Sequence, residues 1–179
     1  MARFEPLKPN EFSLDLKKLY EEVRGSRTVL GGPFSVLLHN PPLAAAIQQV
    51  VNAVRRDGKL EKRLYELIVL IVARHASAAY AWAVHDPLAR QAGLSGEVID
   101  AIQAKRKPVF AKDDERIIYD AVTELVTTSR IGDAAYQALI KQFGLKEAIE
   151  VITCVGLYGM VGAVINTFEV PTPNGEKPF

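Results

Sequence analysis

Two side chains near the middle of the sequence, Glu66 and His85, could move protons. Glu66 lies inside the apolar run LYELIVLIVA at residues 64–73, and His85 follows nineteen residues after it. An imidazole changes its charge near neutral pH, and a buried carboxylate can orient the ring. The two residues are therefore a candidate acid–base pair. The alternative is that Glu66 lies on a helix surface and His85 is a solvated or hydrogen-bonded residue without chemistry.

The elements around this pair decide whether the two side chains can meet. On one continuous helix they would lie about 28 Å apart along the axis. They can approach only if the chain turns back between them. Ser77 is a candidate N-cap for a second helix over 78–92, with Pro87 kinking that helix or, alternatively, standing in the first turn of a new one. We therefore expect Glu66 and His85 to meet across a contact between two helices.

Arg74 and His75 lie between the two members of the pair. Arg74 could hold a substrate carboxylate through two parallel hydrogen bonds, or form an ion pair at the surface or at an interface. His75 could join Glu66 and His85 around zinc or iron. The H-x-x-H or H-x-x-x-H spacing of helical metal sites is absent from the sequence, so we predict no metal site.

Three further residues could contribute to a binding pocket. Tyr80 and Trp82 are two positions apart, so on a helix they point in nearly opposite directions. One of them is expected to face the pocket while the other packs elsewhere. His39 precedes the Asn-Pro-Pro sequence at 40–42 and either decorates a turn or lies near a pocket mouth.

The chain as a whole has the pattern of an all-α protein. Apolar residues recur at helical spacing and no segment shows sustained two-residue alternation. Asn40, Ser95 and Asp113 are expected N-caps, and Gly132 and Gly144 mark further helix boundaries. The predicted helices cover 11–24, 41–56, a segment from about 60, 95–104, 114–128, 133–142 and 146–166. We divide the chain into a lead-in with a short helix (1–32), a helical domain (33–168) and an irregular tail (169–179).

Composition narrows the classes of function. The chain holds 22 Lys plus Arg and 21 Asp plus Glu, for a net charge of +1, so nucleic-acid and anionic-membrane partners are not expected. Cys154 is the single cysteine and allows neither an internal disulfide nor a C-x-x-C centre. No secretory signal is visible, which favours a cytoplasmic location. The apolar stretch 151–168 is interpreted as a buried helix, because its length is marginal for a membrane span.

Several segments resemble the carboxymuconolactone decarboxylase family, of the alkyl hydroperoxide reductase D-like superfamily. They are PF at 33–34, HNPPL at 39–43, RLYE at 63–66, HDPLARQAGLS at 85–95, DDE at 113–115 and the last long helix. The resemblance covers roughly residues 33–168. It implies a single-domain bundle of about six to eight helices that assembles as a homo-oligomer, a trimer or hexamer, with a dimer as the fallback.

The resemblance also places this chain in the branch of the superfamily without redox thiols. Redox members carry C-x-x-C with its second cysteine four residues before the matching histidine, where this chain has Ala78 and Ala81. Thiol peroxidase chemistry at this site is therefore disfavoured. Ala81 also replaces an acidic residue that is common in the non-redox branch.

These observations lead to two hypotheses. The first is a lyase that needs no cofactor and decarboxylates a small carboxylated lactone or related organic acid, as in aromatic-compound catabolism. His85 and Glu66 would be catalytic, while Arg74, His75, Tyr80, Trp82 and His39 would contact the substrate. The second hypothesis is a non-catalytic protein of the same fold that binds a small molecule or serves in assembly. Oligomer formation is expected in either case, because the helix over 146–166 is apolar on almost every face and 41–54 would then lie at a subunit interface.

Overall fold

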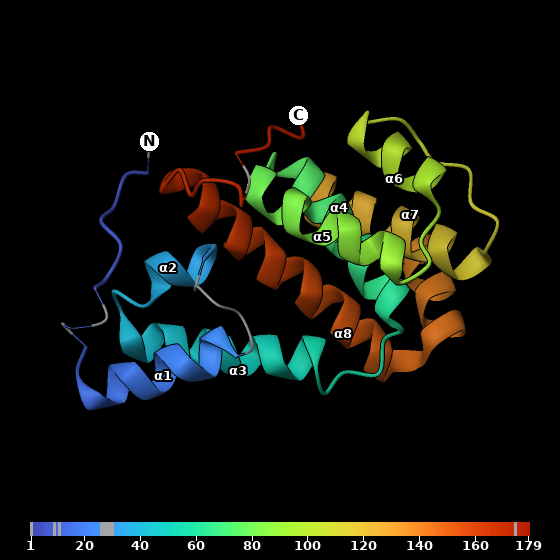
Figure 1. Cartoon of the computed structure of the whole chain (residues 1–179). Helices are drawn as coiled ribbons and strands as arrows, with labels where there is room; N and C mark the ends of the chain where they lie inside the picture. The colour runs from blue at the N-terminus through green and yellow to red at the C-terminus, as the bar shows by residue number, and fades with distance from the viewer. Residues whose placement is uncertain (1, 9, 11, 26–30, 174) are drawn as a thin grey trace.

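The computed structural model describes all residues except 1, 9, 11, 26–30 and 174, and the described residues form eight α-helices and no strand. This confirms the all-α fold class, and Figure 1 shows the arrangement. The helices are α1 (Leu14–Arg24), α2 (Pro33–Leu37), α3 (Pro41–Arg55), α4 (Lys62–His75), α5 (Ala79–Gln91), α6 (Gly96–Gln103), α7 (Asp113–Thr128) and α8 (Asp133–Thr167).

Helix α4 is the centre of the bundle. Its residues 63–73 are all buried, which explains the unbroken apolar run in the sequence. A helix that is apolar on every side must be enclosed by neighbours. Helices α5, α7 and α8 supply that enclosure, and α6 covers part of the remaining surface. Glu66 is carried by this helix and is therefore held deep inside the protein.

The turn between α4 and α5 differs in detail from the expected cap. Ser77 adopts a left-handed φ of 51° and lies inside the turn, while Ala78 is the N-cap of α5 and offers no side-chain hydrogen bond. The turn is closed instead by the backbone, because the Ala78 N–H donates to the Ala73 carbonyl over 2.8 Å. The predicted break between the helices is present, but Ser77 does not cap α5. Pro87 lies inside α5 as expected.

Four of the remaining predicted boundaries agree with the structure, and one does not; among the four, Gly132 is the N-cap of α8. The side chains of Asn40 and Ser95 accept hydrogen bonds from the backbone at the starts of α3 and α6. Gly144 interrupts α8 with φ 73° and ψ 173°, which divides it into two helical segments as predicted. Asp113 was expected to cap α7 but is its first residue, and the preceding Lys112 occupies the N-cap position.

Helix α8 crosses the molecule between the α4–α5 pair and the group formed by α1, α2 and α3 (Figure 1). By length and composition it could span a membrane, and half of its most apolar window is buried inside the fold. Gly162 allows a close approach to the α4–α5 turn, since a Cβ there would lie 3.2 Å from the Ala76 Cβ. The Asn166 side chain donates to the Ala76 carbonyl over 2.7 Å. These contacts hold α8 against the turn.

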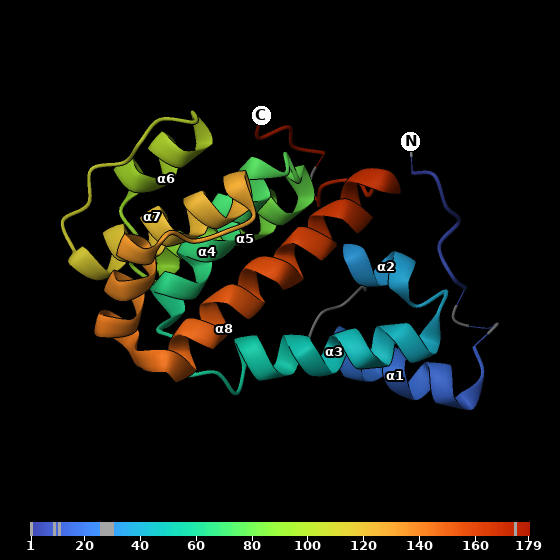
Figure 2. The same cartoon turned by 180° about the vertical axis from the view of Figure 1, so that it is seen from behind.

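Helices α1, α2 and α3 form a second, smaller layer, in which α2 and α3 contact α8 (Figure 2). Val23, Phe34, Leu37, Leu38 and Ala44 are its buried apolar residues. Helix α1 agrees with the predicted helix from residue 14 onward; residue 11 lies outside the described residues. Helix α2 was not predicted, because five residues are too short to show a helical period. This layer forms one wall of the cavity described below.

Candidate active site

The α4–α5 hairpin brings Glu66 and His85 into direct contact. His85 Nδ1 lies 2.6 Å from Glu66 Oε2, and the two residues are 5% and 1% exposed. The two helices pack side by side and run in opposite directions, so residues on either side of the turn can face one another. The predicted contact between the carboxylate and the imidazole is therefore confirmed.

Two tyrosines extend this contact into a buried chain of four side chains. The Tyr158 hydroxyl lies 3.2 Å from His85 Nε2 and 2.6 Å from the Tyr65 hydroxyl. With Glu66 ionised, Nδ1 of a neutral His85 donates to Glu66, and Nε2 accepts from Tyr158. The Tyr158 oxygen then accepts from Tyr65. Burial raises the pKa of both phenols, so both tyrosines stay protonated and able to donate.

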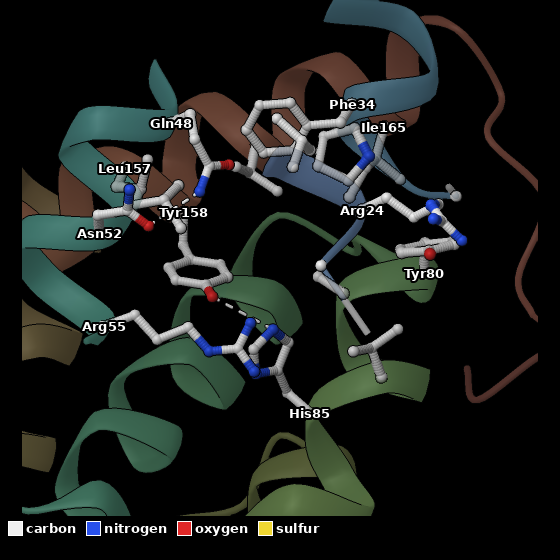
Figure 3. A pocket seen from close by; sticks show the side chains of 18 of the residues that line it. Arg24, Phe34, Gln48, Asn52, Arg55, Tyr80, His85, Leu157, Tyr158 and Ile165 are labelled. Carbon is white, nitrogen blue, oxygen red and sulfur yellow. Dashed lines mark hydrogen bonds between the residues drawn. The ribbon is translucent and has the colours of Figure 1, made fainter. Parts of the chain in front are cut away.

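One end of this chain opens on a cavity of about 540 Å³, which we call the His85 cavity (Figure 3). Its lining includes His85 of α5 and Tyr158 of α8, together with Gln48, Asn52 and Arg55 of α3. Gln48 donates to the Asn52 side chain over 2.9 Å. The rest of the lining includes Arg24, Arg56, Phe34, Tyr80, Ala81, Val84, Leu88, Leu157, Val161 and Ile165. Arginines, amides and the His85 imidazole therefore line one partly apolar cavity.

A comparison with protein-family models identifies part of the chain. Residues 41–124 match the model described as "Carboxymuconolactone decarboxylase family". This segment therefore resembles the carboxymuconolactone decarboxylase family. The match includes α4 and α5, and thus Glu66 and His85, while Tyr158 lies beyond it. The resemblance predicted from the sequence is confirmed. No curated protein matches the sequence.

Solved structures show the same fold over almost the whole chain. An uncharacterised peroxidase-related protein with an AhpD core from Ralstonia eutropha JMP134 superposes with a TM-score of 0.80 at 18% identity, covering 97% of this chain and 93% of that one. The debrominase Bmp8, in complex with 2,3,4-tribromopyrrole, gives 0.75 at 14% identity, covering 98% and 95%. A peroxidase-related protein from Silicibacter sp. TM1040 gives 0.76 at 14%, covering 94% and 90%. At these identities the likeness establishes the fold alone.

Only Tyr80 among the five expected substrate contacts lines the His85 cavity. Gly32 lies so close that a Cβ there would be 2.5 Å from the Tyr80 ring, which explains the glycine before Pro33. Trp82 points elsewhere, as expected for one member of the pair. It is fully buried, and its ring meets the Phe179 ring edge-on at 5.7 Å.

Arg74, His75 and His39 do not line this cavity, contrary to the expectation that they contact a substrate beside His85. Arg74 lies eight residues after Glu66 on the same rigid helix, about 12 Å further along its axis. Its Nε donates to the Gln103 carbonyl over 2.6 Å, and its guanidinium lies over the Phe179 ring. His75 is exposed at the end of α4. His39 packs edge-on against Phe4, with ring centroids 6.2 Å apart.

The thiol and metal alternatives find little support in the residues that the structure describes. Cys154 is completely buried, and burial together with the nearby Glu66 charge raises the pKa of its thiol, which keeps it protonated. Within the described ranges no three His, Cys, Asp or Glu side chains gather as a potential metal site.

Sequence reasoning missed Tyr158 and the polar side of α3. Tyr158 lies within the most apolar helix, where no period distinguishes one face from another. Gln48, Asn52 and Arg55 recur at intervals of four and three residues, which is the spacing of one helix face. That stripe was a usable signal. It was overlooked because the whole segment 41–54 was assigned to an interface.

Proposed function

We propose that this chain is a cytoplasmic decarboxylase that needs no cofactor and acts on a small carboxylated lactone or a related organic acid. The observation that carries the proposal is the buried Glu66–His85–Tyr158 chain, which reaches a cavity that arginines also line. A cavity of about 540 Å³ is large enough for a small organic acid. The resemblance of residues 41–124 to the carboxymuconolactone decarboxylase family supports the same reaction class.

The proposed reaction consumes one proton for each carboxylate lost. The substrate carboxylate binds near Arg55, which lines the same cavity as His85 and can supply paired hydrogen bonds. The carbon–carboxylate bond breaks, carbon dioxide leaves, and the bonding electrons form a dienolate. A hydrogen bond from the Tyr158 hydroxyl stabilises the negative oxygen of that dienolate.

The proton then returns to carbon from His85. The neutral ring first takes up at Nε2 the one proton that the reaction consumes, from bulk solvent, which frees the Tyr158 hydroxyl to donate to the dienolate oxygen. The Glu66 carboxylate stabilises the imidazolium that forms. Transfer of this proton to the dienolate carbon completes the product and restores the neutral ring. Glu66 acts through His85 and is thus a positioning residue, while His85 and Tyr158 touch the reacting atoms.

A second candidate function is binding of a small organic anion without turnover. Two observations favour it: alanines occupy both thiol positions, and the Tyr158 hydroxyl already engages His85 Nε2. In that case Arg55 and the amides of α3 would hold the anion, and the buried chain would only stabilise the cavity wall.

Release of carbon dioxide from 4-carboxymuconolactone and related lactones tests the proposal. Turnover by the wild-type protein is the expected result. The matched variants are Arg55→Gln, which removes a charge from the cavity, and Arg74→Gln, which removes one outside it. We expect the first to raise KM by about tenfold or more and the second to leave it unchanged. Saturable binding of the lactones without any carbon dioxide release would favour the second candidate.

We also propose that the chain forms a closed homo-oligomer, either a trimer or a hexamer. Leu145, Ile149 and Ile152 of α8 are exposed, as are Leu43 and Val50 of α3. Large apolar side chains gathered on two neighbouring helices are typical of surfaces that another subunit covers. A sedimentation mass near the 19.7 kDa of one chain would contradict this proposal.

A further inference from the structure

A second cavity lies away from the active site, between the C-terminal ends of α4 and α6 and the middle of α7. Its volume is about 330 Å³, and none of its lining residues also lines the His85 cavity. We call it the Arg106 cavity. Its lining residues are of three kinds. Ile71, Ile102, Tyr119 and Val126 are largely apolar, Thr123 and Thr127 carry hydroxyl groups, and Arg74, His75, Lys105 and Arg106 are basic.

The basic side of this cavity is not neutralised by the protein. None of its four basic residues forms an ion pair within the described part of the chain, and no Asp or Glu lines the cavity. Basic residues just outside it differ in this respect. Lys107 approaches Asp120 to 3.4 Å, and Arg116 approaches Asp113 to 3.0 Å. Arg74, Lys105 and Arg106 therefore line this cavity without a carboxylate partner among the described residues, and Lys105 and Arg106 are exposed at its edge.

The backbone after α6 places Lys105 and Arg106 at this cavity. Lys105 adopts a left-handed φ of 55°, which few non-glycine residues do. Its N–H donates to the Ile102 carbonyl over 3.0 Å, and the Arg106 N–H donates to the Ala101 carbonyl over 2.8 Å. These two hydrogen bonds form a Schellman motif, in which the chain reverses its direction directly after the last turn of a helix. The backbone at Lys105 and Arg106 is thus held in an ordered turn, from which the two exposed side chains extend.

A buried hydroxyl in the same cavity has no partner. Thr123 Oγ1 is inaccessible to solvent and makes no hydrogen bond in the described structure. Threonines within helices usually donate to a carbonyl in the preceding turn. Thr127 does so, donating to the Thr123 carbonyl over 2.8 Å, and Thr128 donates to the Glu124 carbonyl over 2.9 Å. Thr123 does not, and a rotation of its side chain toward the cavity that it lines would let its O–H donate to an acceptor oxygen there.

Arg74 completes the set of donors. Its Nε donates to Gln103 and its face is covered by Phe179, so the guanidinium is held in place. Its two Nη nitrogens make no hydrogen bond to any described residue. A guanidinium fixed in this manner can give two parallel hydrogen bonds to one oxyanion without losing further side-chain freedom.

We propose that the Arg106 cavity binds a small organic anion whose carboxylate or phosphate contacts Arg74, Lys105, Arg106 and the Thr123 hydroxyl. The apolar part of the molecule packs on Ile71, Ile102 and Val126. Both kinds of oxyanion meet the same requirement of two or more acceptor oxygens on an apolar body. This site is independent of the proposed decarboxylation, because it contains neither His85 nor Tyr158.

Titrations followed by two-dimensional NMR test the site without any need for activity. Phenyl phosphate and benzoate are the two anionic probes, and benzyl alcohol is the neutral control. We expect saturable shifts in amides of 102–106 and 119–127 with at least one anion and none with the alcohol. The tighter of the two anions identifies the preferred oxyanion. Absence of saturable shifts up to about 10 mM of either anion would overturn the proposal.

Two pairs of variants locate the binding energy. The double variant Lys105→Ala, Arg106→Ala is expected to lower the affinity for the anion by about tenfold or more. Lys107→Ala removes a charge outside the cavity and should leave the affinity unchanged. Thr123→Val keeps the shape and removes the unpartnered hydroxyl. This variant should lower the affinity for the anion severalfold without lowering the melting temperature. Thr127→Val, at a neighbouring threonine, is its control. Equal weakening by Lys107→Ala, or none by the double variant, would contradict the site.

Discussion

Two buried polar clusters lie one turn apart on α4, and they differ in what surrounds them. Arg63 is 3% exposed and makes five hydrogen bonds to the carboxylates of Glu61, Asp114 and Glu115. These bonds use all five of its N–H donors. Glu66 and His85 are equally buried, but their chain ends at Tyr158 on the wall of a cavity.

Burial of charge alone therefore does not distinguish a site from a structural cluster. The Arg63 cluster is closed: its donors are matched within the protein, and neither Arg63 nor Glu115 lines the His85 cavity. The His85 chain is open, since a ligand in the cavity can compete for the Tyr158 hydroxyl and for Nε2. We expect the Arg63 cluster to determine stability and the His85 chain to determine turnover. Variants in each can show whether the two roles are separate.

The largest expected effect is on stability, from Arg63→Met. Loss of the guanidinium leaves Glu115 buried without its partner, which should lower the free energy of unfolding by about 3–5 kcal/mol. Urea denaturation measures this change, and turnover per folded molecule should stay the same. Arg116→Met is the control: its ion pairs are exposed, so it should cost less than about 1 kcal/mol. Equal losses in the two variants would show that the Arg63 cluster is not structural.

Tyr158→Phe should affect turnover. The variant keeps the ring and removes the hydroxyl that reaches His85 Nε2, so kcat should fall by about 10²-fold. Tyr65→Phe is the matched control, because Tyr65 contacts Tyr158 and does not line the His85 cavity. It should have a much smaller effect on kcat. Equal losses in kcat would show that Tyr65 and Tyr158 affect turnover through packing and not through the contact of Tyr158 with His85.

Acid should weaken the closed cluster. Burial alone would raise the pKa of Asp114, but the hydrogen bond and charge of Arg63 hold it below its usual value. Since the pKa is lower in the folded state, this stabilisation is present above the unfolded-state value of about 4 and is lost as pH falls through the folded-state value. Unfolding measured across an acid pH series should show a shallower decline in Asp114→Asn. An identical decline in both proteins would remove Asp114 from the acid response.

The smallest effect is expected from Cys154→Ala. The thiol is buried and its raised pKa keeps it protonated, so turnover should change by less than about twofold. A thiol reagent should not react with Cys154 until the protein unfolds. Rapid modification of the folded protein, or a large loss of turnover in the variant, would restore a redox interpretation of the fold.

The helix that carries Glu66 and the turn after it could be predicted from sequence because local signals mark both. An unbroken apolar run requires an enclosed helix, and the nineteen-residue separation from His85 allows contact only across a turn. The Gly144 boundary was equally local. In contrast, Ser77 was assigned to the wrong position because a serine near a helix start suits both a cap and a tight turn.

The partners contributed by distant segments could not be predicted in the same way. Tyr158 is separated from His85 by 73 residues and lies in a helix whose apolar residues cover most faces, so no pattern indicates its direction. Arg55 reaches the cavity only because the first forty residues and α3 fold back against α8. Conversely, Arg74 and His75 are close to Glu66 in sequence but are carried away from it by the rise of α4.

The most direct measurement compares turnover and stability in one variant, His85→Gln. Glutamine can still donate to Glu66, so the free energy of unfolding should fall by no more than about 1–2 kcal/mol. Loss of the imidazole should reduce the rate of carbon dioxide release by about 10²–10⁴-fold. That result would assign the Glu66–His85–Tyr158 chain to catalysis. A variant that turns over the carboxylated lactone at the wild-type rate would contradict it.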